Sequence, residues 1–283
     1  MATPALSVLI ATYRPEGITR VAAMDLPRTE GVEYVVSWQE HENAPVPDAV
    51  ASRPDIKVHR FDLRGVSLNR NNAISHAGAP LLLMSDDDLR YTSAQLTSVI
   101  KAFAEHPEVD YASFMYDGTA GKTYPDAETD ISTPPRWFYQ TCFEIAVRKS
   151  PRTARLLFNP CFGPGAPYFT CGEDEIFYLT ARRMGLNCRF FPITVTAHPH
   201  PSTGQRAISH PGILRTNGAL IALNHPHTFW ARIPANAWRI SRRGRAPLMR
   251  SLAYMYAGAF KALATEGVRE LAHPSHNKPE ENG

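Results

Sequence analysis

The sequence predicts an α/β protein with a mostly parallel central sheet flanked by helices. First, short apolar runs rich in β-branched residues alternate with segments of helical pattern, at the spacing of βαβ units. Second, residues 81–85 carry apolar side chains on both alternating faces, which is typical of a central parallel strand covered by helices on each side. Third, three aspartates follow that strand directly, at the strand end where open α/β sheets bind ligands.

The composition is that of a globular protein. Of the 283 residues 43% are hydrophobic and 20% are charged, which is enough for a sizeable core in one large domain or two smaller ones. The 30 Lys and Arg against 27 Asp and Glu give a net charge of only +3, and aromatic–basic interleaving of the kind that binds nucleic acid is not evident, so we expect no nucleic-acid partner. The four cysteines form no CxxC pair, which fits reduced thiols and argues against a structural zinc site.

No segment has the pattern of a membrane-spanning helix or a leader. The stretch "MATPALSVLIATYRPEG" has no basic segment, and its apolar run is too short for a signal peptide or a spanning helix. We therefore expect a cytoplasmic protein that is soluble or at most peripheral at the inner face of the membrane.

Residues 1–90 are expected to form a Rossmann-like, nucleotide-binding half. Its strands are predicted at residues 6–13, 32–39, 56–63 and 81–85. Pro15 fixes the exit from the first strand. A helix is predicted before the fourth strand, with Ser67 as its N-cap and Gly78 at its C-terminal end.

Residues 91–204 are expected to complete the same domain. The predicted elements are a helix at 92–106, strands at 109–116 and 137–148, a helix at 173–184 and a strand at 188–198. Residues 117–136 are polar and rich in Gly, Pro and Asp, which predicts a long loop of the kind that is usually functional or mobile. From about residue 205 the pattern is helical without strands, which predicts a helical extension over residues 205–283.

The first acidic cluster is Asp86, Asp87 and Asp88. Such a cluster after a strand can be a solvated turn or the N-cap of the next helix. Three adjacent carboxylates repel one another, however, and hard divalent cations such as Mg²⁺ and Mn²⁺ take oxygen ligands of this kind together with substrate phosphates. At the end of a buried strand we favour a metal–diphosphate site over the solvated turn.

The second acidic cluster is Glu173, Asp174 and Glu175, which follow Gly172 at the start of a predicted helix. Carboxylates favour helix N-termini for structural reasons alone, because they complement the helix dipole and cap free N–H groups. The preceding stretch is rich in Gly and Pro and suggests a shaped loop that exposes one acid as a general base. Both interpretations remain open from this cluster by itself.

The two clusters occur in one order within one βα framework, and in this the chain resembles a family 2 glycosyltransferase of the GT-A fold. The stretch "SVLIATYRPEG" is similar to that family's first strand and its Thr-Tyr nucleotide contact. The stretch "GVSLNRNNAISHAGAPLLLMSDDDL" is similar to its helix, strand and DxD element, and "GEDEIFYLTARRMG" to its ED element with the helix that follows. The resemblance runs from Ser7 to about His198.

The resemblance implies a nucleotide-sugar site at the strand ends. The positions that match nucleotide contacts are Thr12, Tyr13, Arg70 and Asn71, the first two toward the base. At the end of the second strand the chain has "SWQEHEN" where the family usually has an acidic "DDGS"-like turn, so Gln39 or Glu40 would read the base. Arg14 also stands where an asparagine is usual, and the identity of the nucleotide is left open.

The resemblance also implies a divalent metal, Mn²⁺ or Mg²⁺. Asp86 would lie toward the ribose and Asp88 on the metal, while Asp87 could take either task. His198, after the last strand, is either an ordinary packed histidine or a further metal ligand, since imidazole is an acceptable Mn²⁺ ligand beside carboxylates.

For the chemistry, Asp174 matches the acid that deprotonates the acceptor hydroxyl, with Glu173 as its neighbour and alternative. The implied reaction is an inverting, metal-dependent transfer from a nucleotide sugar, most simply a UDP-sugar, to a saccharide or lipid-linked saccharide in polysaccharide or glycoconjugate biosynthesis. Residues 91–204 would be the acceptor-binding half, with residues 117–136 as acceptor loop or lid. The alternatives are a non-catalytic nucleotide-sugar or saccharide-binding protein and a sugar nucleotidyltransferase.

The helical extension carries many arginines between aromatic and apolar residues, in "NAWRISRRGRAPLMRSLAYMYAGAF". An arginine-rich helix is often a solvated face. The interleaved Trp238, Tyr254 and Met255 are typical of segments that lie on anionic bilayers. The sequence allows both, and the second would suit a lipid-linked acceptor.

Overall fold

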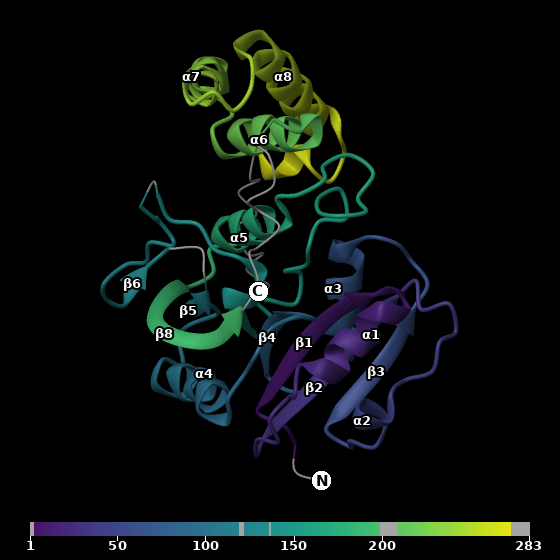
Figure 1. Ribbon diagram of the computed structural model, residues 1–283. Coiled ribbons are helices and arrows are strands. Elements are labelled where there is room, and N and C mark those ends of the chain that lie inside the picture. The colour runs from purple at the N-terminus through teal and green to yellow at the C-terminus, as the bar shows by residue number, and fades with distance from the viewer. Residues whose placement is uncertain (1–2, 119–121, 136, 199–208, 273–283) are drawn as a thin grey trace, which may run out of the picture.

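The structure is a computed structural model that describes residues 3–118, 122–135, 137–198 and 209–272. Within these ranges the chain forms one eight-stranded sheet, helices on both of its faces, and a layer of three helices at one end (Figure 1). The sheet order is β3-β2-β1-β4-β7-β5-β8-β6. The predicted α/β class with a mostly parallel sheet and a helical C-terminal part is confirmed.

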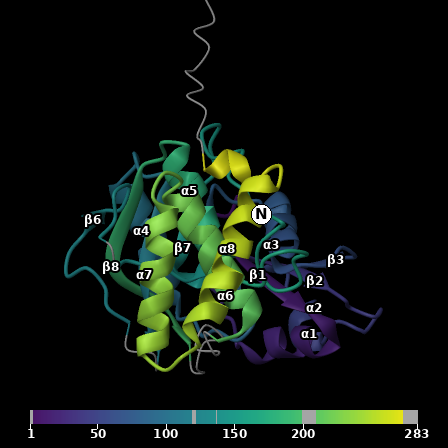
Figure 2. The same ribbon diagram turned by 90° about the horizontal axis from the view of Figure 1, so that it is seen from above.

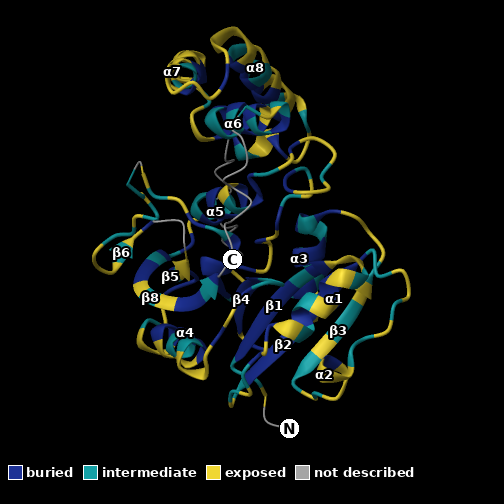
Figure 3. Cartoon of the chain, viewed as in Figure 1, coloured by how far each residue is buried: buried dark blue, intermediate teal, exposed yellow. Residues whose placement is uncertain are grey.

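The first half of the sheet is parallel. Its elements are β1 (Leu6–Tyr13), α1 (Arg14–Ala23), β2 (Val32–Gln39), α2 (Asp48–Ala51), β3 (Ile56–Phe61), α3 (Val66–His76) and β4 (Leu81–Asp86). Strand β1 pairs with both β2 and β4 in parallel register, so it lies at the centre of this half. Both faces of β1 and β2 are buried (Figure 3), whereas the edge strand β3 is partly exposed.

The second half mixes strand directions. Its elements are α4 (Ser93–Glu105), β5 (Tyr111–Gly118), β6 (Thr129–Asp130), the 3₁₀ turn η1 (Cys142–Glu144), β7 (Ile145–Arg148), α5 (Glu173–Arg183) and β8 (Cys188–His198). Strand β7 is antiparallel to its neighbours β4 and β5, whereas β8 is parallel to β5. The predicted loop at 117–136 therefore includes the end of β5 and the short edge strand β6.

Alternation along the strands divides the core between the two sheet faces. Val8 and Ile10 of β1 pack in one cluster with residues of α1 and α4, while Leu9 packs in another with residues of α3 and α5. This follows from the two-residue period of a strand, which turns neighbouring side chains to opposite faces. Helices α3 and α5 therefore share one face of the sheet, although about 100 residues separate them.

The predicted N-cap at Ser67 is wrong. Helix α3 begins at Val66, after Gly65, whose φ of 123° is available to glycine and strained for other residues. The hydroxyl of Ser67 donates to the carbonyl oxygen of Phe162 at 2.7 Å. The Ser67 hydroxyl therefore binds a segment that is distant in the sequence and does not cap the helix.

The predicted strand at 137–148 is mostly wrong. Only Ile145–Arg148 forms a strand, and Cys142–Glu144 forms the turn η1. Thr141 and Glu144 make a reciprocal capping box, with side-chain and backbone hydrogen bonds in both directions. This Thr-x-x-Glu pattern begins a helical turn and overrides the β-propensity of the aromatic residues before it.

The C-terminal layer contains α6 (Pro211–Asn224), α7 (Phe229–Arg242) and α8 (Leu248–Ala264), followed by the 3₁₀ turn η3 (Arg269–Leu271). The three helices lie beside one another in Figure 2, and α6 faces α5 in Figure 1. Among the described residues, no helix combines the length and the apolar character that crossing a membrane requires. The predicted boundary at residues 204 and 205 lies outside the described residues.

Candidate functional site

The predicted site residues gather at the edge of the sheet where β1, β2 and β4 end. Tyr13 and Gln39 are the last residues of their strands and are paired in register, and Asp86 ends β4 beside Ala11. This edge holds the carboxyl ends of parallel strands, where α/β folds bind ligands.

Arg70 of α3 lies at the centre of the site. Its Nη2 donates to Asp86 Oδ1 at 2.9 Å, and its Nη1 donates to Glu173 Oε1 at 3.1 Å and to Asp174 Oδ1 at 3.3 Å. The Arg70 side chain is only 6% exposed. One buried cation therefore holds three carboxylates from two parts of the chain, and the DxD-like and ED-like clusters meet in space.

Asp174 is held on both carboxylate oxygens. Its Oδ2 accepts the backbone N–H of Cys142 at 3.0 Å, while Oδ1 faces Arg70. Burial, followed by the charge of Glu173, raises the pKa of Asp174 well above its ordinary value, and Arg70 opposes this only in part. Three carboxylates surround the single guanidinium of Arg70, so a negative charge on Asp174 is only partly compensated. The raised pKa also makes the Asp174 carboxylate a stronger base than an ordinary aspartate.

Asp87 faces away from this centre. Its carboxylate accepts hydrogen bonds from the hydroxyl of Thr12 and from Nε and Nη2 of Arg20, at 3.1 and 2.8 Å for the arginine. The hydrogen bond to Asp87 raises the pKa of Arg20. Both of its predicted tasks, metal binding and ribose binding, would compete with these bonds. The side chain of Thr12 is buried and contacts Asp87 directly.

Asp88 and His198, two of the predicted metal ligands, lie close to each other. His198 Nε2 lies 3.5 Å from Asp88 Oδ2, and the imidazole stacks on Phe143 with ring centroids 5.4 Å apart. Within the described ranges, no group of three or more His, Cys, Asp or Glu side chains is placed to hold a metal ion. A carboxylate and an imidazole fit a Mn²⁺ or Mg²⁺ site of the kind that takes its other ligands from water and diphosphate oxygens.

Tyr13 and Glu40 are the accessible members of the predicted nucleotide site. The Tyr13 side chain is 52% exposed at the end of β1, with the guanidinium groups of Arg14 and Arg20 over its ring. Glu40 forms ion pairs with Arg14 at 3.3 Å and Arg64 at 3.2 Å. An exposed aromatic ring beside arginines is suited to stacking on a base.

Gln39 and Asn71 contact backbone groups instead. The amide nitrogen of Gln39 donates to the carbonyl oxygens of Leu63 and Gly65. Asn71 accepts from the N–H of Phe158 and donates to its carbonyl oxygen, each at 2.8 Å. Both amides thus fix loops next to the site, and their predicted contacts with the nucleotide stay predictions.

Two parts of the site were not predicted from the sequence. One is Arg20, whose bidentate contact with Asp87 spans 67 residues and left no sequence signal. The other is a buried ion pair between Lys122 and Glu144, which holds the turn whose Cys142 N–H binds Asp174. The Thr-x-x-Glu capping pattern at 141–144 was a readable signal for that turn.

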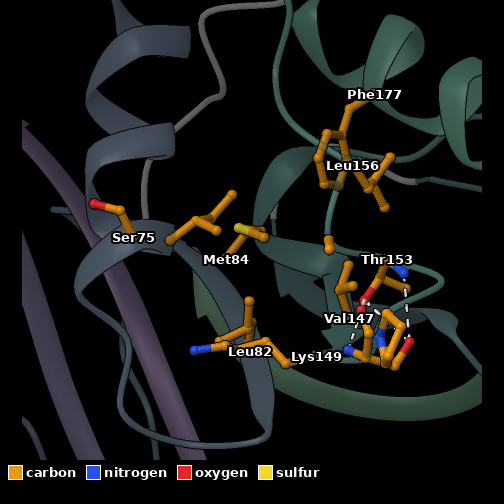
Figure 4. A pocket seen from close by; sticks show the side chains of 12 residues that line it. Ser75, Leu82, Met84, Val147, Lys149, Thr153, Leu156 and Phe177 are labelled. Atoms are coloured by element: carbon orange, nitrogen blue, oxygen red, sulfur yellow. Dashed lines mark hydrogen bonds between the residues drawn. The ribbon is translucent and has the colours of Figure 1, made fainter.

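A separate pocket of about 520 Å³ lies between α3, β4, β7 and α5 (Figure 4). It is lined mainly by apolar side chains, among them Leu82, Met84 and Phe177, with Lys149 as its one charged lining residue. The amino group of Lys149 donates to the carbonyl oxygen of Ala77. None of the carboxylates of the site lines this pocket, so we do not assign the diphosphate to it.

A comparison with known proteins identifies one protein family. The family model described as glycosyl transferase family 2 matches residues 39–162. No curated protein matches the chain.

The structure is similar to crystal structures of TarS from S. aureus. The form 1-349 in complex with UDP has a TM-score of 0.54 at 17% identity over 77% of this chain, and the chain spans 65% of its length. A second TarS structure has the same score and identity, and the chain spans 40% of it. The complex of TarS 1-349 with UDP-GlcNAc also has a TM-score of 0.54 at 17% identity, over 95% of this chain and 78% of that one. At this level of identity the likeness establishes the fold.

Proposed function

Because the chain has the GT-A fold and carries a glycosyl transferase family 2 segment, we propose that it is an inverting glycosyltransferase that uses a nucleotide-sugar donor and a divalent metal. Asp174 is its general base. The observation that carries this proposal is the meeting of Asp86, Glu173 and Asp174 on the buried Arg70. Through Arg70, the end of β4 lies next to the start of α5. A glycosyltransferase needs this proximity, because its donor and its acceptor must bind side by side.

Asp88 and His198 would hold the divalent metal, with Asp86 next to them on the ribose side. When bound, a divalent cation neutralises the negative charge of a diphosphate leaving group. Asp87, held by Thr12 and Arg20, would keep the chain between Asp86 and Asp88 in one conformation rather than bind the ligand itself. Of the three aspartates, we therefore assign Asp86 and Asp88 to the DxD pair.

Asp174 would take the proton of the acceptor hydroxyl. The hydroxyl oxygen then forms a bond to the anomeric carbon while the bond from that carbon to the diphosphate oxygen breaks, and its electron pair leaves with the diphosphate. Attack from the opposite face inverts the anomeric configuration. The N–H of Cys142 and the guanidinium of Arg70 hold Asp174 in position during this step.

The donor we propose is a UDP-sugar. The exposed Tyr13 ring would stack on the base, and Glu40 would lie beside it. The TarS complexes with UDP and UDP-GlcNAc support this choice at the level of the shared fold. The acceptor would be a saccharide or lipid-linked saccharide, bound by the half of the chain after residue 90.

The test is a screen of nucleotide sugars with Mn²⁺ or Mg²⁺, followed by Asp174→Asn and Asp88→Ala. We expect Asp174→Asn to bind donor normally and to lose about 10²- to 10⁴-fold in turnover, the usual contribution of a general base. Asp88→Ala should lose metal-dependent donor binding. Normal turnover in Asp174→Asn would refute the base assignment.

The products separate the alternatives. Release of a nucleoside diphosphate supports sugar transfer, whereas release of pyrophosphate from a nucleoside triphosphate identifies a nucleotidyltransferase. Donor binding without turnover on any acceptor would favour a saccharide-binding protein. A matched control is Lys101→Gln, an exposed change on α4 away from the strand ends.

A further inference from the structure

The C-terminal layer differs from the rest of the chain in its charge. Residues 209–265 contain seven arginines and one lysine but no aspartate or glutamate, although the whole chain carries a net charge of only +3. Among the described residues, none of these eight cations forms an ion pair with a carboxylate. A surface of this kind attracts an anionic partner.

The same layer exposes apolar side chains in rows. On α7, Trp230 and Trp238 are 55% and 54% exposed and lie eight residues apart, whereas Ile233 and Ala237 of the same helix are buried. On α8, Met249 and Phe260 are 74% and 49% exposed. Figure 3 shows exposed residues along the outer sides of both helices.

The two rows meet. The rings of Trp230 and Phe260 lie 5.6 Å apart, and Tyr256 lies 6.2 Å from each of them. Arg242 stacks over Trp238 at 5.0 Å. The surface of α7 and α8 therefore combines exposed aromatic and apolar side chains with arginines, which is typical of helices that lie in a membrane interface.

We propose that the outer face of α7 and α8 binds an anionic lipid bilayer. A bilayer offers acidic headgroups to the arginines and an apolar layer to Trp238, Met249 and Phe260. A nucleic acid offers only the first of these. A second copy of this face would bring its arginines close to those of the first copy, which opposes self-association.

The experiment uses the full chain and vesicles of phosphatidylcholine alone or with about one third phosphatidylglycerol. Cosedimentation should detect binding to the anionic vesicles only. The triple change Arg239→Gln, Arg242→Gln and Arg250→Gln should lower the partition coefficient on the order of 100-fold, at about fivefold per cation. The pair Trp238→Ala and Met249→Ala should lower it about tenfold or more.

The matched control is the triple change Arg28→Gln, Lys101→Gln and Arg155→Gln, which removes three exposed cations from other parts of the surface and should bind as the wild type does. Thermal unfolding confirms that every variant folds. Absence of binding to the anionic vesicles, or unchanged binding by both helix variants, overturns the proposal. Binding to heparin without binding to vesicles would also overturn the proposal, and so would a dimer of the wild type that dissociates in the helix variants. Either result would assign the face to another partner.

This inference does not depend on the proposed reaction. None of the substituted residues lies among the carboxylates around Arg70, so hydrolysis of a donor sugar in solution should be unchanged in the helix variants. The helix variants should lose vesicle binding and keep normal hydrolysis, whereas Asp174→Asn should keep vesicle binding and lose sugar transfer. These two results test the two proposals independently.

Discussion

At the scale of single residues, the site depends on one arginine shared by three acids. Arg70 is buried, and Asp86, Glu173 and Asp174 all contact it. One positive charge does not neutralise three negative ones, and the side chains of Glu173 and Asp174 are only 12% and 19% exposed, so one of these carboxylates is held at the expense of stability. The raised pKa of Asp174 identifies it as that group. Such an electrostatic cost to stability is common at catalytic groups.

We predict that Asp174→Asn stabilises the fold at neutral pH. The pKa of Asp174 is raised on folding, so the native state binds more protons than the unfolded state between the two pKa values, and the free energy of unfolding falls as pH rises through that window. Asparagine removes this penalty and keeps an acceptor for the Cys142 N–H. The melting temperature of the variant should exceed that of the wild type at pH 7, and the difference should shrink toward pH 4, near the ordinary pKa of aspartate.

The same shift predicts the acid side of the pH–rate profile. The proton must leave Asp174 before it can act as a base, so kcat/KM should fall with decreasing pH through a pKa above that of an ordinary aspartate. A profile that stays flat down to pH 4 would contradict the assignment. The stability result is independent of this, since it requires no substrate.

At the scale of elements, the turn η1 connects a buried ion pair to the proposed base. Lys122 and Glu144 have side chains that are 2% and 0% exposed, and Glu144 also accepts from Thr141 and from the hydroxyl of Tyr124. Burial lowers the pKa of Lys122, and the charge of Glu144 opposes this. The turn that they hold presents the Cys142 N–H to Asp174.

We predict that Glu144→Gln destabilises the protein by about 3–5 kcal/mol, because it leaves the buried Lys122 without its carboxylate. Chemical denaturation measures this. The double change Lys122→Met with Glu144→Gln should lose less than the single change, since no buried cation then remains. Equal losses would mean that the ion pair itself contributes little.

Helices α6 and α8 pack backbone against backbone. A Cβ added to Gly218 would lie 1.8 Å from the carbonyl oxygen of Met255, and one added to Gly258 would lie 1.9 Å from that of Arg215. Neither glycine can gain a methyl group unless a helix moves. The C-terminal layer is thus fixed by two small residues on crossing helices.

We predict that Gly218→Ala costs at least about 3 kcal/mol, at the upper end of overpacking changes. For a chain of this size the melting temperature should fall by about 6 °C or more. The control is Gly244→Ala, where nothing lies within 4 Å of the added methyl group and only the strain of a φ of 64° is paid, about 1 kcal/mol. A similar loss in both variants would contradict close helix packing as the cause.

At the scale of the whole molecule, the site joins two parts of the chain. Arg70 belongs to α3 of the parallel half, whereas Glu173 and Asp174 begin α5 of the second half. The Val66 N–H also donates to the carbonyl oxygen of Pro164, so the start of α3 is tied to the loop that precedes α5. A ligand that fills this junction should stabilise both parts together.

We predict that UDP with Mn²⁺ raises the melting temperature of the whole chain in a single transition. A ligand at 100 times its dissociation constant adds about 2.7 kcal/mol, which corresponds to several degrees at this size. Asp88→Ala should keep the melting temperature of the free protein and lose most of the Mn²⁺-dependent part of the shift. A shift that is unchanged in Asp88→Ala would exclude Asp88 as a metal ligand.

The sequence predicted much of the fold and both acidic clusters. Residues 6–13, 32–39 and 188–198 were assigned to strands with the bounds that the structure has. The errors fell at Ser67 and at 137–148, where a contact with distant Phe162 and a capping box overrode local propensity. Arg20 could not be found, because its role depends on a partner 67 residues away.

The sequence by itself determined that strands and helices alternate, that aspartates follow a buried strand, and that residues 209–265 carry positive charge alone. These are local patterns, fixed by side-chain period and composition. Only the tertiary structure decided that Arg70 would bind both acidic clusters, that Asp87 would turn to Arg20, and that the apolar rows of α7 and α8 would lie outward. The physical reason is that these contacts join residues that are far apart in the sequence. Such ion pairs and helix contacts form only after the sheet has brought the distant segments together.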